Sequence, residues 1–333
     1  MRASTTLCLC LLLVLFFTST PAQNLNWFSF DADFIKAQYA PDSAIGKIKA
    51  RHFDRAKSVH SVECGGNDGE IHIGILLKDV DLPDSQSPIS APFGKESEWG
   101  IVTELPNAKL AKGVAALDRL QNKPITFEGY FRVWDEGHSV GKVHPSNPHH
   151  VFEVHPAWGF SGEGGVRFSR PDLVNSIAGF AGYGRSKFSI VLKEISDGTS
   201  PRVFQNNGRL HLGIMKAENF YQLPVKIKRI KAVTGGHELT MDVFSSNTFA
   251  TLLYKDLAGI TVTGSPTDKK FKVGDKTFIL GFFSVNLRKA LNISSGAGAA
   301  AEARSARNAV EFFVFGPALR SAVKTCSRME EDL

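Results

Sequence analysis

The stretch PNAKLAKGVAALDRLQNKPITFEGYFRVW, residues 106–134, sets an amphipathic segment directly before a β-like one. Small and apolar residues recur every three or four positions across 108–117, and charged residues lie between them, which is the pattern of a helix with one buried face. Pro124 ends that pattern, and residues 125–134 are rich in β-branched and aromatic side chains. We therefore expect a helix at about 107–121 and a strand immediately after it.

Further strands are expected on both sides of this stretch. Three precede it, at about 45–62, 70–77 and 99–105, and one follows at 150–155. The resulting order is β-β-β-α-β-β, with the helix between the third and fourth strands. A five-stranded OB barrel has this order of elements, so we expect one in the first half of the chain.

Segments of the second half resemble segments of the first half in the same order. Residues 69–75 resemble 208–214, 129–133 resemble 281–285, and 152–157 resemble 313–318. Chance similarity among β-strands is the alternative to a true repeat. The three matches together favour a mainly β protein with two OB-like β-barrels in tandem, the second of them degenerate.

These patterns divide the chain into six parts. They are a signal peptide (1–22), an N-terminal segment (23–44), a first OB-like barrel (45–160), a linker with a short helix (161–184), a degenerate second OB-like barrel (185–320) and a C-terminal tail (321–333).

The N-terminus has the layout of a secretory signal peptide. Residues 7–17 are eleven consecutive apolar residues, with Arg2 before them and a small-residue stretch ending at Ala22 after them. Cleavage near Ala22 leaves 311 residues with a formal charge of +5 and no apolar run long enough to span a bilayer. We therefore expect a soluble protein that is secreted or periplasmic. Its mild charge makes nucleic acid an unfavoured partner without excluding it.

Two cysteines remain after cleavage, Cys64 and Cys326. An even number of cysteines in an oxidising compartment favours a disulfide between them, and two free thiols are the alternative.

Histidine and glutamate gather around the fifth expected strand. Strand alternation places His149, Glu153 and His155 on one face, while Phe152 and Val154 face the core. We therefore expect Glu153 and His155 together on the outer face or at the barrel mouth. Imidazole and carboxylate groups at this spacing suit a metal such as zinc, which is the single cofactor that the sequence suggests.

His72 or His138 would complete the ligand shell of such a metal. A Glu–His acid–base pair is one alternative. Another is a structural hydrogen bond that holds the strand end to its loop, with Pro156 ending the strand ladder.

A second set of residues suggests ligand binding. Basic residues alternate along the first expected strand, either as a solvated face or as a groove that attracts anions. Aromatic residues near one end of the first barrel are suited to stacking on sugar rings or bases. The two groups are Lys47, Lys49 and Arg51, and Tyr130, Trp134 and Trp158.

Several of these motifs resemble a family of secreted bacterial proteins of unassigned function. The family pattern combines an Asp-Gly-Asp-x-His strand, a later strand with spaced Gly and Asp, and a terminal Glu-x-His-Pro. This chain has Asp-Gly-Glu-Ile-His at 68–72, a strand at 125–129 with Asp135 beyond it, and Glu-Val-His-Pro at 153–156. The resemblance covers about residues 63–160.

The resemblance implies an OB-like barrel and draws attention to His72, Glu153 and His155, but it implies no activity. Phe152 stands where the family often has Trp. In the matched segment of the second half, Val314 and Gly316 replace the Glu–His pair, which argues against two equivalent sites.

Familiar catalytic motifs such as Gly-x-Ser-x-Gly, His-Glu-x-x-His and the phosphate-binding Gly-x-x-x-x-Gly-Lys are absent from the sequence. This favours a non-enzyme without deciding the question. The preferred hypothesis is a module that binds an extracellular or periplasmic ligand or polymer. The alternatives are a metal-assisted hydrolase that uses the His/Glu cluster at 138–155, and a structural envelope protein without a ligand.

Overall fold

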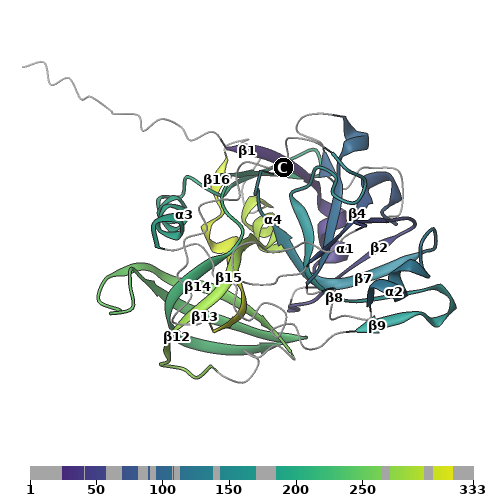
Figure 1. Ribbon diagram of the computed structural model, residues 1–333. Helices are drawn as coiled ribbons and strands as arrows, with labels where there is room; N and C mark the ends of the chain where they lie inside the picture. Colours follow the sequence, from purple (N-terminus) through teal and green to yellow (C-terminus); the bar gives the residue numbers. More distant parts are fainter. Residues whose placement is uncertain are drawn as a thin grey trace, which may run out of the picture.

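The computed structural model is mainly β, and its strands form three sheets (Figure 1). It describes residues 25–40, 42–57, 70–81, 89–90, 95–106, 108, 113–137, 143–169, 185–263, 271–295 and 303–317. Among these residues, we find no helix that is both long and apolar enough to cross a membrane. Cys64, Cys326, His138, the expected signal peptide and the expected helix of the linker lie outside the described residues.

The first sheet curls round on itself. Its strand order is β2-β7-β8-β6-β4-β3, with β9 paired to β8. Because only residues 51–53 separate β2 from β3, the two ends of this order lie next to each other. Its strands are β2 (Gly46–Ala50), β3 (Asp54–Arg55), β4 (Ile71–Leu76), β6 (Gly100–Leu105), β7 (Ile125–Val133), β8 (Phe152–Gly162) and β9 (Arg167–Ser169).

The second sheet is a closed barrel with the order β12-β13-β14-β17-β15, drawn in green to yellow in Figure 1. Its β14–β17 pair is parallel, as is the β6–β8 pair of the curled sheet. Its strands are β12 (Tyr221–Val233), β13 (Gly236–Phe244), β14 (Leu252–Val262), β15 (Lys276–Val285) and β17 (Val310–Pro317).

The third sheet joins the N-terminal segment to the middle of the chain in the order β16-β10-β11-β1-β5. Its strands are β1 (Asn26–Asp31), β5 (Ile89–Ser90), β10 (Arg202–Asn206), β11 (Arg209–Ile214) and β16 (Arg304–Ser305). The N-terminal segment is therefore an integral part of the fold.

The helices are short and lie between the sheets or on their edges. Asp31 caps the first of them, because its carboxylate accepts hydrogen bonds from the backbone N–H groups of Asp33 and Phe34 at 2.9 and 2.7 Å. The α-helices are α1 (Ala32–Gln38), α2 (Gly113–Asp118), α3 (Arg185–Asp197) and α4 (Leu287–Ser295). Single 3-10 turns occur at Leu77–Asp79, Glu96–Glu98, Glu163–Gly165 and Arg307–Ala309.

The order of elements expected for residues 45–160 agrees with the first sheet, and α2 lies between β6 and β7. The first expected strand is divided, because residues 51–53 separate β2 from β3. The expectation that Pro156 ends the fifth strand is wrong, because β8 continues to Gly162. His155 and Pro156 together stand opposite the single residue Tyr130 of β7, which is a β-bulge. The bulge accommodates Pro156, which has no N–H group for the ladder.

Two expected boundaries and one expected repeat differ from the structure. The first sheet ends at Ser169, since Glu163–Gly165 forms the turn between β8 and β9. The closed barrel begins at Tyr221, after α3 and two strands of the third sheet. The match of 69–75 with 208–214 pairs β4 of the curled sheet with β11 of the third sheet, so these segments are not equivalent.

The curled sheet and the closed barrel meet where β7 lies beside β15. The backbone N–H of Val133 donates a hydrogen bond to Ser284 Oγ at 3.1 Å, and that hydroxyl points back to Phe131 O at 3.5 Å. A cluster of buried aromatic rings surrounds this contact, including Tyr130, Phe282 and Phe313. We call this region the junction.

Replacing Ser284 with Ala should destabilise the protein, because the buried N–H of Val133 would lose its acceptor. The expected loss is about 1–3 kcal/mol of unfolding free energy, measured by urea denaturation. Ser295→Ala, at the exposed end of α4, is the control and should change the value by less than about 0.5 kcal/mol. Equal stabilities for the two variants would contradict the assigned contact.

Candidate functional site

Strand β8 presents Glu153 and His155 to the junction. The sequence correctly predicts that Phe152 and Val154 face the other way, into the core. It is wrong in placing the Glu–His pair on an outer face or barrel mouth, because Glu153 and His155 are 2% and 0% exposed. The closed barrel covers them, and Phe282 lies with its ring centre 4.9 Å from the His155 ring.

Arg132 of β7 supplies a buried positive charge beside this pair. Its Nη1 lies 3.0 Å from Glu153 Oε2, its Nη2 pairs with Glu136, and its guanidinium lies 4.4 Å from the centre of the Phe282 ring. Burial acts to lower the pKa of Arg132, but Glu136 and Glu153 outweigh it and raise that pKa. Arg132 is therefore a fixed cation in the junction.

His155 lies among three carboxylates. Its Nδ1 is 2.8 Å from Glu104 Oε2 and 3.2 Å from Glu153 Oε2, and its Nε2 is 3.2 Å from Glu70 Oε1. Burial acts to lower the pKa of His155, but Glu104 and Glu70 outweigh it and raise the pKa well above the usual value. This arrangement favours the imidazolium, which donates hydrogen bonds and has no lone pair for a metal.

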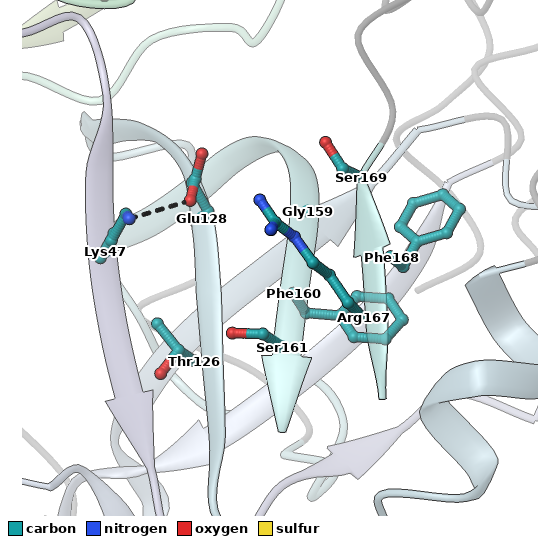
Figure 2. Close-up of a pocket in the computed structure, with 9 residues that line it drawn as sticks. All are labelled: Lys47, Thr126, Glu128, Gly159, Phe160, Ser161, Arg167, Phe168 and Ser169. Carbon is teal, nitrogen blue, oxygen red and sulfur yellow. Dashed lines mark ion pairs between the residues drawn. The ribbon is translucent and has the colours of Figure 1, made fainter. Parts of the chain in front are cut away.

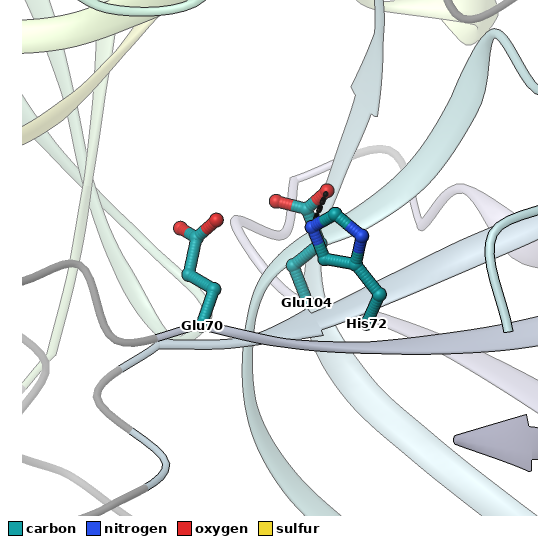
Figure 3. A group of neighbouring side chains, drawn as sticks. All are labelled: Glu70, His72 and Glu104. Carbon is teal, nitrogen blue, oxygen red and sulfur yellow. Dashed lines mark ion pairs between the residues drawn. The ribbon is translucent and has the colours of Figure 1, made fainter. Parts of the chain in front are cut away.

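Glu104 connects the pair on β8 to the neighbouring strands. It comes from β6, and His72 of β4 places its Nε2 3.5 Å from Glu104 Oε1 (Figure 3). Burial acts to raise the pKa of Glu104, whereas the nearby His155 and His72 lower it, and the lowering prevails. Glu70, just before β4, projects from the same side of the strands as Glu104 and His72 (Figure 3).

His150 reaches the cluster from the loop that precedes β8. Its Nε2 lies 3.2 Å from Glu153 Oε1, and its Nδ1 lies 2.7 Å from the carbonyl oxygen of Pro148. His149 does not join the cluster, although strand alternation predicts it on the face of Glu153. Its ring contacts Trp99 at 5.7 Å, because β8 starts only at Phe152 and alternation does not extend back to the loop.

The structure thus unites three of the predicted ligands, His72, Glu153 and His155, and adds four charged or polar residues. These are Glu70, Glu104, Arg132 and His150. The sequence alone could have indicated a role for Glu104, since it is a carboxylate within the apolar strand GIVTEL at 100–105. Buried carboxylates inside apolar strands are rare unless they are paired.

The aromatic residues predicted to stack on a ligand are buried. Tyr130 donates a hydrogen bond from its hydroxyl to Glu311 Oε1 at 2.7 Å, and Trp134 contacts the Phe283 ring at 5.8 Å. Trp158 belongs to the aromatic cluster of the junction. The prediction of a stacking surface is therefore wrong for these rings, because the closed barrel covers the end of the first sheet where they lie.

The predicted basic residues remain at the surface. Lys47 and Lys49 are exposed on one face of β2, and Arg51 pairs with Asp81 at 3.3 Å. Lys47 lines a hollow of about 260 Å³ on the outer face of β2, β7, β8 and β9 (Figure 2). We call this hollow the groove. It is lined by Lys47, Thr126, Glu128, Gly159, Phe160, Ser161, Arg167, Phe168 and Ser169.

Positive and hydrogen-bonding groups border the groove. The side chains of Lys47 and Arg167 reach toward it from opposite sides, and Glu128 stands between them with its Oε2 3.2 Å from Lys47 Nζ (Figure 2). Phe168 adds an apolar border, and its ring stacks on Phe160 at 5.2 Å. Arg167 was not predicted, because its strand β9 falls in the expected linker.

Comparison with known proteins adds no relative to these observations. Neither the protein-family models nor the curated proteins compared with this sequence include a match. The resemblance to a family of secreted bacterial proteins therefore stays a prediction.

Replacing Arg132 with Met should strongly destabilise the protein, because Glu136 and Glu153 would stay buried without their cation. Breaking a buried ion pair by removing one partner costs about 3–5 kcal/mol, which urea denaturation would detect. Arg229→Met, at an exposed position of β12, is the matched control and should cost less than about 1 kcal/mol. A small effect at both positions would contradict the role assigned to Arg132.

Proposed function

We propose that this protein binds an anionic ligand in the groove on the outer face of its first sheet. The observation that carries the proposal is the pair of cationic side chains, Lys47 and Arg167, that border one hollow from two different strands. Together with Glu128 they give the groove a net positive charge, and such a surface attracts anions.

The groove's other residues narrow the class of ligand. Thr126, Ser161 and Ser169 carry hydroxyl groups that donate and accept hydrogen bonds, as the hydroxyls of a sugar require. The half-buried Phe168 ring offers an apolar edge beside them. Cationic, hydroxyl and aromatic groups together suit an acidic polysaccharide, in which each sugar carries a carboxylate.

Lys49 extends the basic surface beyond the groove. It lies two residues along β2 from Lys47 and points to the same side of the strand. A ligand longer than one sugar ring would run from the groove along this strand. An extended chain therefore fits this surface better than a single small anion.

We also propose that the first sheet and the closed barrel are two OB-like barrels in tandem. The β2/β3 segment, β4, β6, β8 and β7 follow one another around the first sheet as β12, β13, β14, β17 and β15 do around the closed barrel. If the five strands of each sheet are numbered along the chain, their order around the sheet is therefore 1-2-3-5-4 in both cases. In both, the third and fifth strands form a parallel pair.

Residue positions across the two sets support this equivalence. Glu153 of β8 lies opposite Val102 of β6 and Arg132 of β7. In the closed barrel, Glu311 of β17 lies opposite Ala258 of β14 and Ser284 of β15, the corresponding third and fourth strands. The equivalent of Glu153 is thus Glu311, three residues before the Val314 that sequence matching suggests. The helix is the main difference, since α4 falls between the fourth and fifth strands of the second set.

Ligand binding on an exposed sheet face is common among OB barrels, although fold alone does not decide function. The metal-assisted hydrolase is not proposed, because the His/Glu cluster is enclosed by the junction and a catalytic metal needs an open position for water or substrate. A structural protein without a ligand is the outcome that the next experiment would support if binding fails.

The double variant Lys47→Gln/Arg167→Gln should lose retention on an immobilised acidic polysaccharide such as polygalacturonate, because it removes both cations of the groove. Retention should fall by at least about tenfold at low salt, and wild-type retention should itself weaken with added salt. Lys255→Gln/Arg304→Gln, at exposed positions outside the groove, is the matched control. Equal retention of both double variants, or no retention of the wild type, would reject the proposal.

We also propose that the protein is exported and carries a Cys64–Cys326 disulfide, on the sequence features given above. The intact mass of secreted material should correspond to a chain that starts after Ala22 and lacks two hydrogens. Retention of residues 1–22 would contradict export by this signal, and a fully reduced mass would contradict the disulfide.

A further inference from the structure

We propose that Glu104, His150 and Glu153 form a closed binding site for one divalent transition-metal ion such as Zn²⁺, within the junction. The site is separate from the groove and does not depend on ligand binding there. All three side chains are buried, and each offers one ligand atom within 4.8 Å of the other two.

His150 provides the first argument, because its tautomer is fixed. Nδ1 lies 2.7 Å from the carbonyl oxygen of Pro148, which only accepts hydrogen bonds, so Nδ1 carries the hydrogen. The other ring nitrogen, Nε2, faces Glu153 Oε1 at 3.2 Å. Two lone pairs repel at this distance, so either a hydrogen bond or a metal ion must join these two atoms.

This geometry is also typical of metal-binding histidines. Such a histidine almost always donates its other ring N–H to a carbonyl or a carboxylate, which orients the ring and makes the ligating nitrogen more basic. Pro148 serves this purpose for His150. The same loop residue therefore fixes both the tautomer and the direction of Nε2.

Glu104 provides the second, independent argument. The single Nδ1 hydrogen of His155 faces two carboxylate oxygens, Glu104 Oε2 at 2.8 Å and Glu153 Oε2 at 3.2 Å. One N–H group cannot be aligned with both of these buried oxygens. A further cation between the two carboxylates would therefore stabilise them.

Glu153 has the support that a metal-binding carboxylate needs. Arg132 and His155 both hold its Oε2, at 3.0 and 3.2 Å, and this leaves Oε1 directed toward His150. One oxygen is therefore fixed by cations of the protein while the other is available to the ion. Imidazole and carboxylate together suit zinc and similar first-row metals.

The dimensions suit an ion of this size. Zinc bonds to histidine nitrogen and carboxylate oxygen at about 2.0–2.2 Å, so ligand atoms around it lie about 3.3–4.4 Å apart. Side-chain shifts of a few tenths of an ångström would bring these three atoms into that range. Because the site is enclosed, the ion would hold β6, β8 and their preceding loop together, as structural zinc does.

A neighbouring set, Glu70, His72 and Glu104, also lies within 4.8 Å. It shares Glu104, so the two sets compete for one carboxylate. The His72 side chain is 18% exposed, against 2% for His150, so water reaches the His72 set more easily than the His150 set. The enclosed His150 set is therefore favoured, and the His72 set is an alternative that the experiment must separate.

The test uses the full chain without a histidine tag, stripped with EDTA and titrated with Zn²⁺. Calorimetry and elemental analysis should give about one bound equivalent, and Zn²⁺ should raise the melting temperature of the stripped protein. His150→Gln and Glu104→Gln should each weaken Zn²⁺ binding by at least about a hundredfold and abolish the rise in melting temperature.

The controls are His72→Gln and His211→Gln, the latter on a half-buried histidine of the third sheet that stacks on Phe204. Both should bind Zn²⁺ as the wild type does. Loss at His72 with retention at His150 would overturn the proposal in favour of the neighbouring set.

Two results on the unmodified protein keep the proposal falsifiable if the variants fail to fold. X-ray absorption of the bound zinc should show one imidazole and oxygen ligands, and a shell with two or more imidazoles would overturn it. Fewer than about 0.2 equivalents of bound Zn²⁺ at saturation would reject the site and leave the cluster as a set of ion pairs.

Discussion

A buried guanidinium, Arg132, is the group on which the arrangement of the junction depends. Removing a charge from water costs several kcal/mol, and attraction offsets that cost only when partners are close and well oriented. Glu136 and Glu153 supply this attraction, and the face of Phe282 covers the guanidinium from the closed barrel. The charges therefore restrict how the two sheets meet, because moving either sheet would expose or unpair them.

The groove and the junction are two parts of one continuous sheet face. Along β7, Thr126 and Glu128 are half-exposed and line the groove, whereas Tyr130 and Arg132 point to the same side and are buried. The difference arises because the closed barrel covers only the far half of the strand. One alternating sequence thus supplies a polar surface at one end and a charged interior at the other.

The sequence predicts local features well because these depend on neighbouring residues. The helix before β7, the positions of β4, β6 and β7, and the shared face of Glu153 and His155 all follow from periodicity and turn residues. The sequence does not say what covers a face. For that reason it places Glu153 outside, treats Tyr130 as a stacking surface and assigns Arg167 to a linker.

Sequence periodicity also does not predict which residues of distant strands meet in the junction. Glu104 and His150 meet Glu153 only because a parallel pair joins β6 to β8 and a loop turns back toward it. The pairing of Ser284 with Glu311, like that of Arg132 with Glu153, is likewise visible in the strand register and not in sequence matching, which aligns Glu153 with Val314.

The small side chain of Ser284 has a consequence for self-association. It lies opposite Glu311 of β17, as Arg132 lies opposite Glu153 of β8, and next to the backbone of Phe131 and Val133 where the sheets touch. Two copies of the first sheet brought together in the same way would set a guanidinium where the serine now fits, and like charges would be buried face to face. The small hydroxyl at this position thus favours contact between the curled sheet and the closed barrel of one chain over contact between the curled sheets of two chains.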